Sequence, residues 1–346
     1  MRNKHSTSVE QRHHHLDNYR SPDLIREFSK VFIDSINHNL EGRCEADLPT
    51  YFQHYAPKAV EYWLEKYIEC TVLNHWPREH GMFMLAQASE LARGHWFMHR
   101  HQGKTLDVSV FDRLFQVEAR AVRRDLDNSE DRLTAWLTNI SVAVLCNDQA
   151  ALDEMFKVEH KDLCQSFEGQ PIRDIELAFF DLFRAFLIGE SDRQRQIQLM
   201  KAVIPVLTDE ILIEACDGGE YWQDFYQWLR FPLYSIISVC WGFEDTSLDD
   251  AVTAAMDANY EYYAEVEPLQ YHEPTGEKSP YLLENDAMFH TITTAFLAVH
   301  YQRTNQTISF DSKYVPLWLV KGEGPSREDV LANPPVFDLE HVLSQT

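Results

Sequence analysis

Four histidines in the first third of the chain are the best candidates for metal ligands: His80, His95, His99 and His101. His95 and His99 are four residues apart, a spacing that places two imidazoles on one face of a helix. A zinc site needs a third ligand, and a helical metalloprotease carries a glutamate directly after the first histidine, where this chain has Trp96. We therefore predict no metal site and interpret these histidines as core or interface residues.

Carboxylates and nucleophiles give no better enzymatic motif. A di-iron bundle requires Glu-x-x-His pairs on its central helices, but that spacing occurs only from Glu10 to His13, near the polar N-terminus. Asp249 and Asp250 are followed by threonine and alanine at positions 253 and 254, not by the further carboxylate of an aspartate-rich magnesium site. The chain also lacks a glycine-rich phosphate loop and a Gly-x-Ser-x-Gly motif. We predict that the protein is not an enzyme, with no catalytic residue and no cofactor.

Acidic and aromatic residues are concentrated in one long stretch. Residues 209–286 contain eighteen carboxylates and two cations, Arg230 and Lys278, with tyrosines and tryptophans interspersed. Charge of one sign at this density destabilises a compact chain unless solvent, salt or a basic partner compensates, so a solvated acidic face and a binding surface both remain open. Asp257, Glu261 and Glu265 recur every four residues, which would align them on one helix face. Ten residues are predicted to bind a partner: Glu214, Asp217, Glu220, Tyr221, Asp224, Asp249, Asp250, Asp257, Glu261 and Glu265.

The overall charge narrows the choice of partner. With 31 Lys and Arg against 55 Asp and Glu, the formal net charge is −24, which opposes binding to nucleic acid or to an anionic membrane and favours a cationic protein. The polar N-terminus does not predict a signal peptide, and no run of about 18 apolar residues predicts a transmembrane helix. The six cysteines include no Cys-x-x-Cys pair, which is typical of reduced thiols. We expect a cytoplasmic protein.

Hydrophobic periodicity predicts helices along most of the chain. We expect an all-α fold of stacked antiparallel helical hairpins, either solenoid-like or a compact multi-helix bundle. Residues 107–126 are a further amphipathic stretch, strand-like alternation is confined to residues 307–310, and the tail from residue 311 is irregular with one short helical turn. The predicted helices begin at Ser21 and about Pro57, and continue over residues 81–101, 129–146, 149–167, 172–188, 192–207, 249–265 and 282–302.

Composition divides the chain into three parts. Residues 1–20 are polar and rich in histidine, and we expect them to be a flexible N-terminal segment. Residues 21–322 make up the helical domain, either as one body or as two subdomains with a boundary near residue 207. Residues 323–346 form a C-terminal tail.

Two segments are similar to those of a known family. An alanine-rich helix, Gly81-Met-Phe-Met-Leu-Ala-Gln-Ala-Ser-Glu-Leu-Ala, lies early in the chain, and Asp311-Ser-Lys-Tyr-Val-Pro-Leu-Trp-Leu-Val-Lys-Gly follows the last long predicted helix. Together they resemble the immunity protein 49 family of bacterial polymorphic toxin systems, over roughly residues 24–322. The resemblance implies an all-helical immunity-type domain that neutralises a partner toxin by occlusion, without catalytic residues.

The charge pattern and the resemblance favour the same hypothesis. A basic, nuclease-like toxin would be attracted to an acidic surface that mimics the phosphate backbone of its substrate. We therefore expect an immunity protein that binds and neutralises such a toxin through the acidic, aromatic-rich surface. The alternative is a helical scaffold or adaptor that binds a peptide or protein in a groove between its hairpins.

Overall fold

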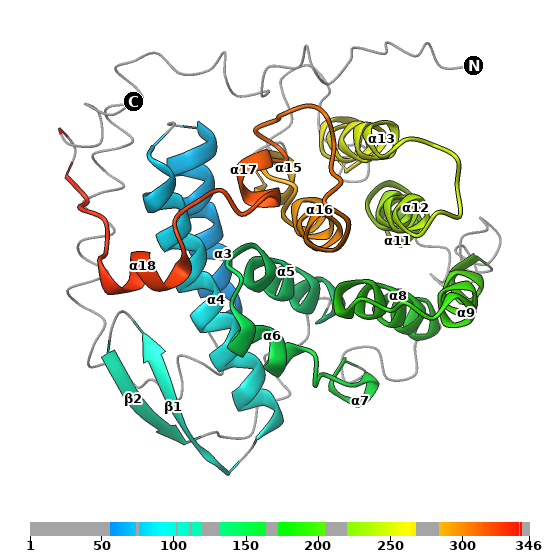
Figure 1. Ribbon diagram of the computed structural model, residues 1–346. Coiled ribbons are helices and arrows are strands. Elements are labelled where there is room, and N and C mark those ends of the chain that lie inside the picture. Colours follow the sequence, from blue (N-terminus) through cyan, green and yellow to red (C-terminus); the bar gives the residue numbers. More distant parts are fainter. Residues whose placement is uncertain are drawn as a thin grey trace. The chain divides into compact units, whose positions relative to one another are not determined.

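The computed structural model describes residues 56–73, 76–101, 103–110, 113–118, 132–163, 172–204, 220–267, 284–338 and 340. Most of these residues are helical, and the helices pack compactly within each unit of the chain, which confirms the predicted all-helical bundle (Figure 1). There are two such units. The amino-terminal unit contains the described residues from 56 to 163 together with 322–340, and the central unit contains those from 172 to 321. The boundary expected near residue 207 lies outside the described residues.

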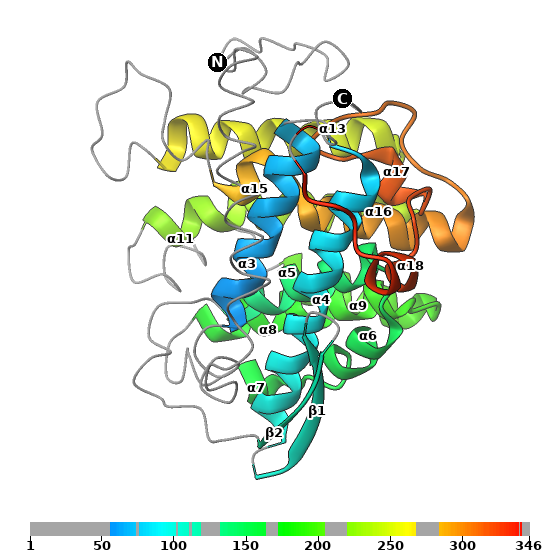
Figure 2. The same ribbon diagram turned by 90° about the vertical axis from the view of Figure 1, so that its left-hand side faces the viewer.

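One long helix organises the amino-terminal unit. α4 (Arg78–Arg100) is rich in alanine and buries most of its side chains. α3 (Ala56–Tyr67) lies alongside it and continues into a π-helical turn, η2 (Ile68–Leu73) (Figures 1 and 2). Gly81 makes this close packing possible, because a Cβ at that position would overlap Thr71 Oγ1 and crowd the Tyr67 ring. The alanine-rich stretch is therefore a helix–helix contact surface.

The next two helices correspond to the hairpin predicted over residues 129–146 and 149–167, except that the second helix ends at Met155 and is followed by a separate short helix. α5 (Arg132–Leu145) and α6 (Gln149–Met155) both pack against α4. Between them Asn147 adopts a left-handed backbone with φ of 54°, which ends α5, and the Asp148 carboxylate accepts a hydrogen bond from the Ala151 N–H at 3.1 Å, which caps α6. The short α7 (His160–Leu163) follows α6, and α18 (Arg327–Ala332) returns to pack on α4.

The amphipathic stretch at residues 107–126, expected within an all-helical chain, begins instead with a β-hairpin. β1 (Thr105–Val110) pairs antiparallel with β2 (Arg113–Glu118), with Leu106 opposite Val117 and Val108 opposite Phe115. Leucine and valine at positions 106, 108 and 110 alternate with polar residues, the two-residue period of a strand. Within the described residues this hairpin is the only sheet.

The central unit begins with the second predicted hairpin, α8 (Ile172–Ile188) and α9 (Arg193–Val203), which turns at Gly189 with φ of 94°. α11 (Glu220–Phe225), the π-helical η5 (Tyr226–Arg230) and α12 (Phe231–Cys240) then form a continuous helical segment. α13 (Leu248–Glu261) packs on α12 and continues into a second π-helical segment of this unit, η6 (Tyr262–Val266) (Figures 1 and 2). α15 (Asn285–Met288), α16 (Thr291–Thr304) and α17 (Leu317–Val320) complete the unit.

Aromatic side chains from α8 and α16 fill the centre of this unit. Phe183 and Phe186 both contact Phe296, with ring centroids 5.5 and 5.1 Å apart. Arg303, near the end of α16, donates hydrogen bonds to the carbonyls of Phe186 and Leu187 at 2.6 and 2.7 Å. These bonds cap the last turn of α8, where the Phe186 carbonyl also accepts from the Gly189 N–H at 3.1 Å.

The remaining sequence predictions concern the N-terminus, residues 307–310, the helix over residues 282–302 and the tail from residue 311. The helix expected at Ser21 and the segment 1–20 lie outside the described residues. Residues 307–310 do not form a strand; Ile308 and Phe310 instead bury their side chains in the core. The helix predicted over residues 282–302 is interrupted between α15 and α16, where the His290 N–H bonds the Tyr314 carbonyl at 2.9 Å, and the tail from residue 311 contains two short helices rather than one.

None of the described helices combines the length and the apolar character that a bilayer-spanning helix requires.

Candidate partner-binding surface

Charge is most one-sided in residues 243–267 of the central unit, which we call the acidic segment. It consists of the turn after α12, α13, η6 and Glu267. The segment contains no Lys or Arg. Its eight carboxylates are Glu244, Asp245, Asp249, Asp250, Asp257, Glu261, Glu265 and Glu267.

The first turn of α13 explains part of this acidity. Ser247 is the N-cap: its Oγ accepts from the Asp250 N–H at 3.1 Å and donates to the Asp250 carboxylate at 2.7 Å. Asp249 and Asp250 therefore lie where the helix leaves its amide groups unpaired and where negative charge is favoured. The Asp249 carboxylate also accepts from the N–H of Ser309 at 2.9 Å and from its hydroxyl. Asp249 is thus a structural residue as well as a candidate for binding.

Burial on one side of α13 determines which side faces solvent. Ala251, Val252, Ala255 and Met256 join a core cluster that includes Leu297 of α16. Leu248 also packs against this cluster, whereas the acids of α13 are exposed or half-buried. A helix with an apolar stripe and an opposite polar face is the ordinary consequence of this spacing.

Arg193, at the start of α9, holds the turn that leads into α13. Its guanidinium donates to the carbonyls of Trp241 and Gly242 at 2.5 and 3.2 Å and lies 3.6 Å from the centroid of the Phe243 ring. The two bonds satisfy carbonyls at the end of α12. The following side chains, Glu244 and Asp245, are exposed on the turn that these bonds hold.

The predicted ridge of Asp257, Glu261 and Glu265 spans the junction between α13 and the π-helical η6. Asp257 and Glu261 lie one turn apart on α13, both half-buried. Glu265 lies in η6, where the Glu267 N–H bonds the Tyr262 carbonyl five residues earlier. Each residue of a π turn advances less around the helix axis than in an α-helix, but four residues still return to nearly the same face, so Glu265 stays on the side of the other two and is exposed where they are half-buried.

The other predicted binding residues lie toward α11. Glu214 and Asp217 are outside the described residues. Glu220 and Tyr221 open α11, and Asp224 lies in the same helix, half-buried. The structure therefore brings together Asp249, Asp250, Asp257, Glu261 and Glu265 on α13 and η6, and places the described α11 positions on a separate helix.

Two carboxyl groups have pKa values raised above their ordinary range: Glu267, the last residue of the acidic segment, and Asp286 of α15. Burial, reinforced by the neighbouring Glu284, raises the pKa of Glu267 to about 7. Burial also raises the pKa of Asp286 to about 6, although the positive charge of Arg230 acts in the opposite direction. Because these pKa values lie near neutral pH, the ionised fraction of both groups changes there, and the negative charge of this region depends on pH.

Comparison with known proteins identifies the family of this chain. The sequence profile described as Immunity protein 49 matches residues 61–319. The chain belongs to the immunity protein 49 family. It is therefore an immunity protein, and membership implies a toxin as its partner. No curated protein and no solved structure matches the chain.

The histidines that sequence analysis singled out have packing roles in this immunity protein. His80 is buried, with Nε2 3.0 Å from the Val336 carbonyl oxygen and its ring edge-on to Trp76. His95 and His99 both contact the Trp96 ring. His101 lies against Phe97, and its Nε2 is 3.5 Å from the Glu154 carboxylate. Among the described residues, no group of three potential ligands could hold a metal ion.

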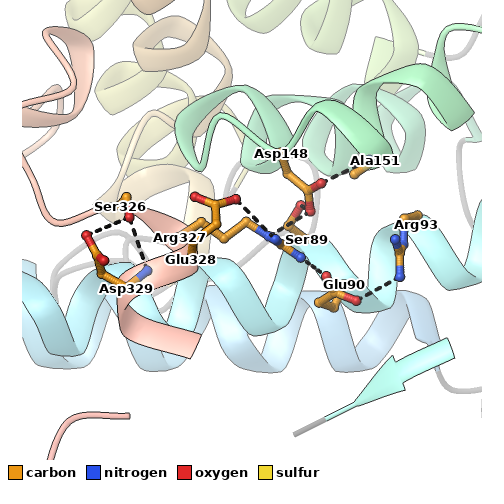
Figure 3. Close-up of polar contacts among 9 residues, drawn as sticks. All are labelled: Ser89, Glu90, Arg93, Asp148, Ala151, Ser326, Arg327, Glu328 and Asp329. Carbon is orange, nitrogen blue, oxygen red and sulfur yellow. Dashed lines mark hydrogen bonds and ion pairs between the residues drawn. The ribbon is translucent and has the colours of Figure 1, made fainter. Parts of the chain in front are cut away.

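A buried ionic cluster in the amino-terminal unit was missed by the sequence analysis. Arg327 of α18 forms ion pairs with Glu90 of α4 and with Asp148, its Nε lying 3.0 Å from Asp148 Oδ2 (Figure 3). The Ser89 hydroxyl donates to the same Asp148 oxygen at 2.8 Å, and Arg93 pairs with Glu90 at 3.0 Å. Each buried carboxylate therefore has a cation or a hydrogen-bond donor as its partner. Such a cluster of ion pairs links α18 to α4 and stabilises the packing of the two helices. No local spacing in the sequence could have revealed it.

Proposed function

We propose that this immunity protein neutralises a basic, nuclease-like toxin in the cytoplasm by binding it through the acidic segment and covering its active site. The observation that carries the proposal is the composition of residues 243–267, eight carboxylates without a single Lys or Arg, on a helix whose apolar face is already buried. Solvent-exposed acids that serve only solubility are usually mixed with cations. A one-sided surface favours a partner of opposite charge.

Electrostatics would act first on the rate of association. Exposed carboxylates at Glu244, Asp245, Asp250 and Glu265 attract a cationic surface over about 8 Å at physiological ionic strength. Attraction of this kind raises association rates and weakens as salt is added. Nucleic acid is disfavoured as a partner by the same charges.

Aromatic residues next to the acids would supply contact area. Trp228 and Tyr260 are partly buried hydrophobic residues packed against Tyr262 and Tyr263, and Trp241 is half-buried at the end of α12. Tyrosine and tryptophan are enriched among residues that dominate binding energy in protein interfaces. The proposed surface therefore combines carboxylates that would attract a basic partner with aromatic side chains that could supply binding energy.

The test uses the toxin domain encoded in the adjacent reading frame. Co-expression of this chain should restore growth of a bacterium that makes the toxin, and the two proteins should co-elute from a sizing column in a salt-sensitive complex. The variant Asp245→Lys/Glu265→Lys should weaken the complex and flatten its salt dependence. The control Glu79→Lys/Glu323→Lys makes the same charge change at exposed glutamates of the amino-terminal unit.

Two results would decide against this assignment. If both double variants weaken binding equally, the acidic segment is not the binding surface. If toxicity is unaffected by this chain, and the chain instead captures several peptides with little salt dependence, the adaptor function becomes the better interpretation.

A further inference from the structure

Residues 322–338, which we call the C-terminal segment, return to the amino-terminal unit and pack on α4 (Figure 1). They lie beyond residues 61–319, which the family profile matches. α18 is the helical part of this segment, and its Val330 side chain is buried. The ion pair of Arg327 fixes α18 beside Glu90 of α4. The segment is thus attached to α4 before the chain reaches residue 333.

The second part of the segment, residues 333–338, has the sequence Asn-Pro-Pro-Val-Phe-Asp and forms neither a helix nor a strand. Pro334 and Pro335 have no N–H group and a restricted φ, which favours an extended chain before any contact is made. A chain that is already extended loses less conformational freedom when it is immobilised. These residues therefore have the properties of a preorganised peptide ligand.

An aromatic surface at the start of α4 receives this peptide. His80 and Phe83 lie one turn apart on α4, and the Trp76 ring is edge-on to His80 with ring centroids 5.6 Å apart. The Phe337 ring lies 5.2 Å from the His80 ring and 5.7 Å from the Phe83 ring. Edge-on and tilted contacts at these distances are favourable for aromatic rings. Phe337 is therefore the main side-chain contact between residues 333–338 and this surface.

A hydrogen bond fixes the position of the peptide backbone. His80 Nε2 is 3.0 Å from the Val336 carbonyl oxygen, and because a carbonyl can only accept, Nε2 must carry the donated proton. His80 is 1% exposed, so this donor is shielded from water. The Val336 side chain is 63% exposed and contributes little to the contact. The surface thus selects a backbone carbonyl and the aromatic ring that follows it.

We infer that Trp76, His80 and Phe83 form a peptide-binding site for an extended Pro-Pro-x-aromatic segment, and that residues 333–338 of the same chain are its ligand. Surfaces lined by aromatic side chains bind preformed proline-containing segments in several classes of peptide-binding domain. The C-terminal segment is held on α4 by two separate contacts, the ion pairs of Arg327 and the aromatic contact of Phe337. This inference does not depend on the toxin or on the acidic segment.

The connection before α18 keeps the ligand close to its site. Gly322 has a left-handed backbone with φ of 66°, and Glu323 beside it is exposed. A short linker of this kind gives an attached ligand an effective concentration in the millimolar range. A modest intrinsic affinity is then sufficient to keep the site filled, which agrees with the half-buried position of Phe337. The peptide should therefore be exchangeable once it is no longer attached.

Exchange of the segment for a free peptide tests the inference. A specific protease site is inserted after the exposed Glu323, so that the cleaved protein keeps every residue of the chain. A fluorescent peptide of residues 326–338 is added to the cleaved protein, and fluorescence anisotropy should show that it binds in place of the cleaved segment. A Phe337→Ala peptide should bind about tenfold more weakly or worse, whereas the matched Val336→Ala peptide should bind within about twofold of the unaltered one.

The uncleaved chain gives a second measurement that does not depend on whether cleavage preserves the fold. Here the attached segment competes with the added peptide for the same site. Phe337→Ala in the chain weakens the attached competitor and should raise the apparent affinity for the unaltered peptide about tenfold. Val336→Ala in the chain should leave that affinity within about twofold. Circular dichroism of both variants verifies that their folds are equal.

Two results would overturn the inference. The first is an added peptide that binds neither the cleaved protein nor the uncleaved Phe337→Ala chain, which would mean that residues 333–338 are held only as part of the folded core. The second is equal binding of the Phe337→Ala and Val336→Ala peptides, which would mean that the aromatic surface does not select its ligand. Both results would leave the proposed binding of a toxin by the acidic segment unaffected.

Discussion

Ser309 donates two hydrogen bonds to the carboxylate of Asp249, one from its backbone N–H at 2.9 Å and one from its hydroxyl. The two residues are 60 positions apart in sequence. Asp249 belongs to the first turn of α13, whereas Ser309 lies in the irregular segment after α16. The bonds therefore fix the beginning of the acidic helix to a distant part of the central unit.

Removal of this carboxylate should destabilise the fold. We expect Asp249→Ala to lower the free energy of unfolding by about 1.5–3 kcal/mol, because hydrogen bonds to a charged group are lost. Asp245→Ala, at an exposed position in the preceding turn, should change it by less than about 0.5 kcal/mol. Urea unfolding monitored by circular dichroism measures both. Equal effects of the two variants would show that Asp249 has no structural role.

The hairpin of α8 and α9 shows what the sequence could predict. Apolar spacing defines α8 over residues 172–188, and Gly189 marks the turn, because a left-handed backbone there suits glycine. Helices and turns of this kind can be predicted from neighbouring residues alone. The β-hairpin at residues 105–118 was missed for two reasons. Its strands are only six residues each, and the sequence analysis treated residues 107–126 as one amphipathic stretch, which concealed the two-residue period.

The candidate site was predictable in composition but not in geometry. The acidity of α13 and its capping serine follow from local sequence, since both concern neighbouring residues. The bonds from Arg193 to the turn at Trp241, and from Ser309 to Asp249, join residues that only the folded chain brings together. The π turn at η6 likewise was not predicted by the regular helical spacing of the sequence.

The turn before α13 should depend on the shape of the Arg193 side chain. A lysine has one ammonium group and can neither donate in the same forked geometry nor stack on Phe243 in the same way. We expect Arg193→Lys to increase hydrogen exchange at residues 241–245 and to lower the free energy of unfolding by about 1 kcal/mol. Arg195→Lys, also exposed and on the same helix, is the matched control. Unchanged exchange in Arg193→Lys would mean that the guanidinium does not hold the turn.

The ionic cluster at Arg327 should be essential to the amino-terminal unit. Arg327→Met leaves the buried Asp148 carboxylate without its cation and leaves Glu90 with Arg93 alone, and loss of one member of a buried pair costs about 3–5 kcal/mol. Glu328→Gln alters a residue whose side chain is 73% exposed, and should change stability by less than about 0.5 kcal/mol. Denaturant unfolding gives both values, and exchange of the α18 amides reports whether that helix detaches. A loss below about 1 kcal/mol for Arg327→Met would contradict a structural role.

Stability should fall as pH rises through the range where Glu267 and Asp286 titrate. Their pKa values in the folded chain are about 7 and about 6, above the ordinary values of 4.5 and 3.8. Between pH of about 4 and about 7 the folded chain therefore binds more protons at these groups than the unfolded chain does, so their contribution to the free energy of unfolding decreases with increasing pH and levels off above that range.

Substitution isolates this contribution from that of the other acids. Glu267→Gln and Asp286→Asn should each flatten the decline in urea midpoint measured at pH 5, 6 and 7.5, because the group that must ionise is gone. Glu265→Gln, at an exposed glutamate of the same segment, should preserve the slope of the unaltered chain. Slopes that are the same in all four proteins would show that neither carboxyl is perturbed by its burial, and that the charge of this end of the acidic segment is constant near neutral pH.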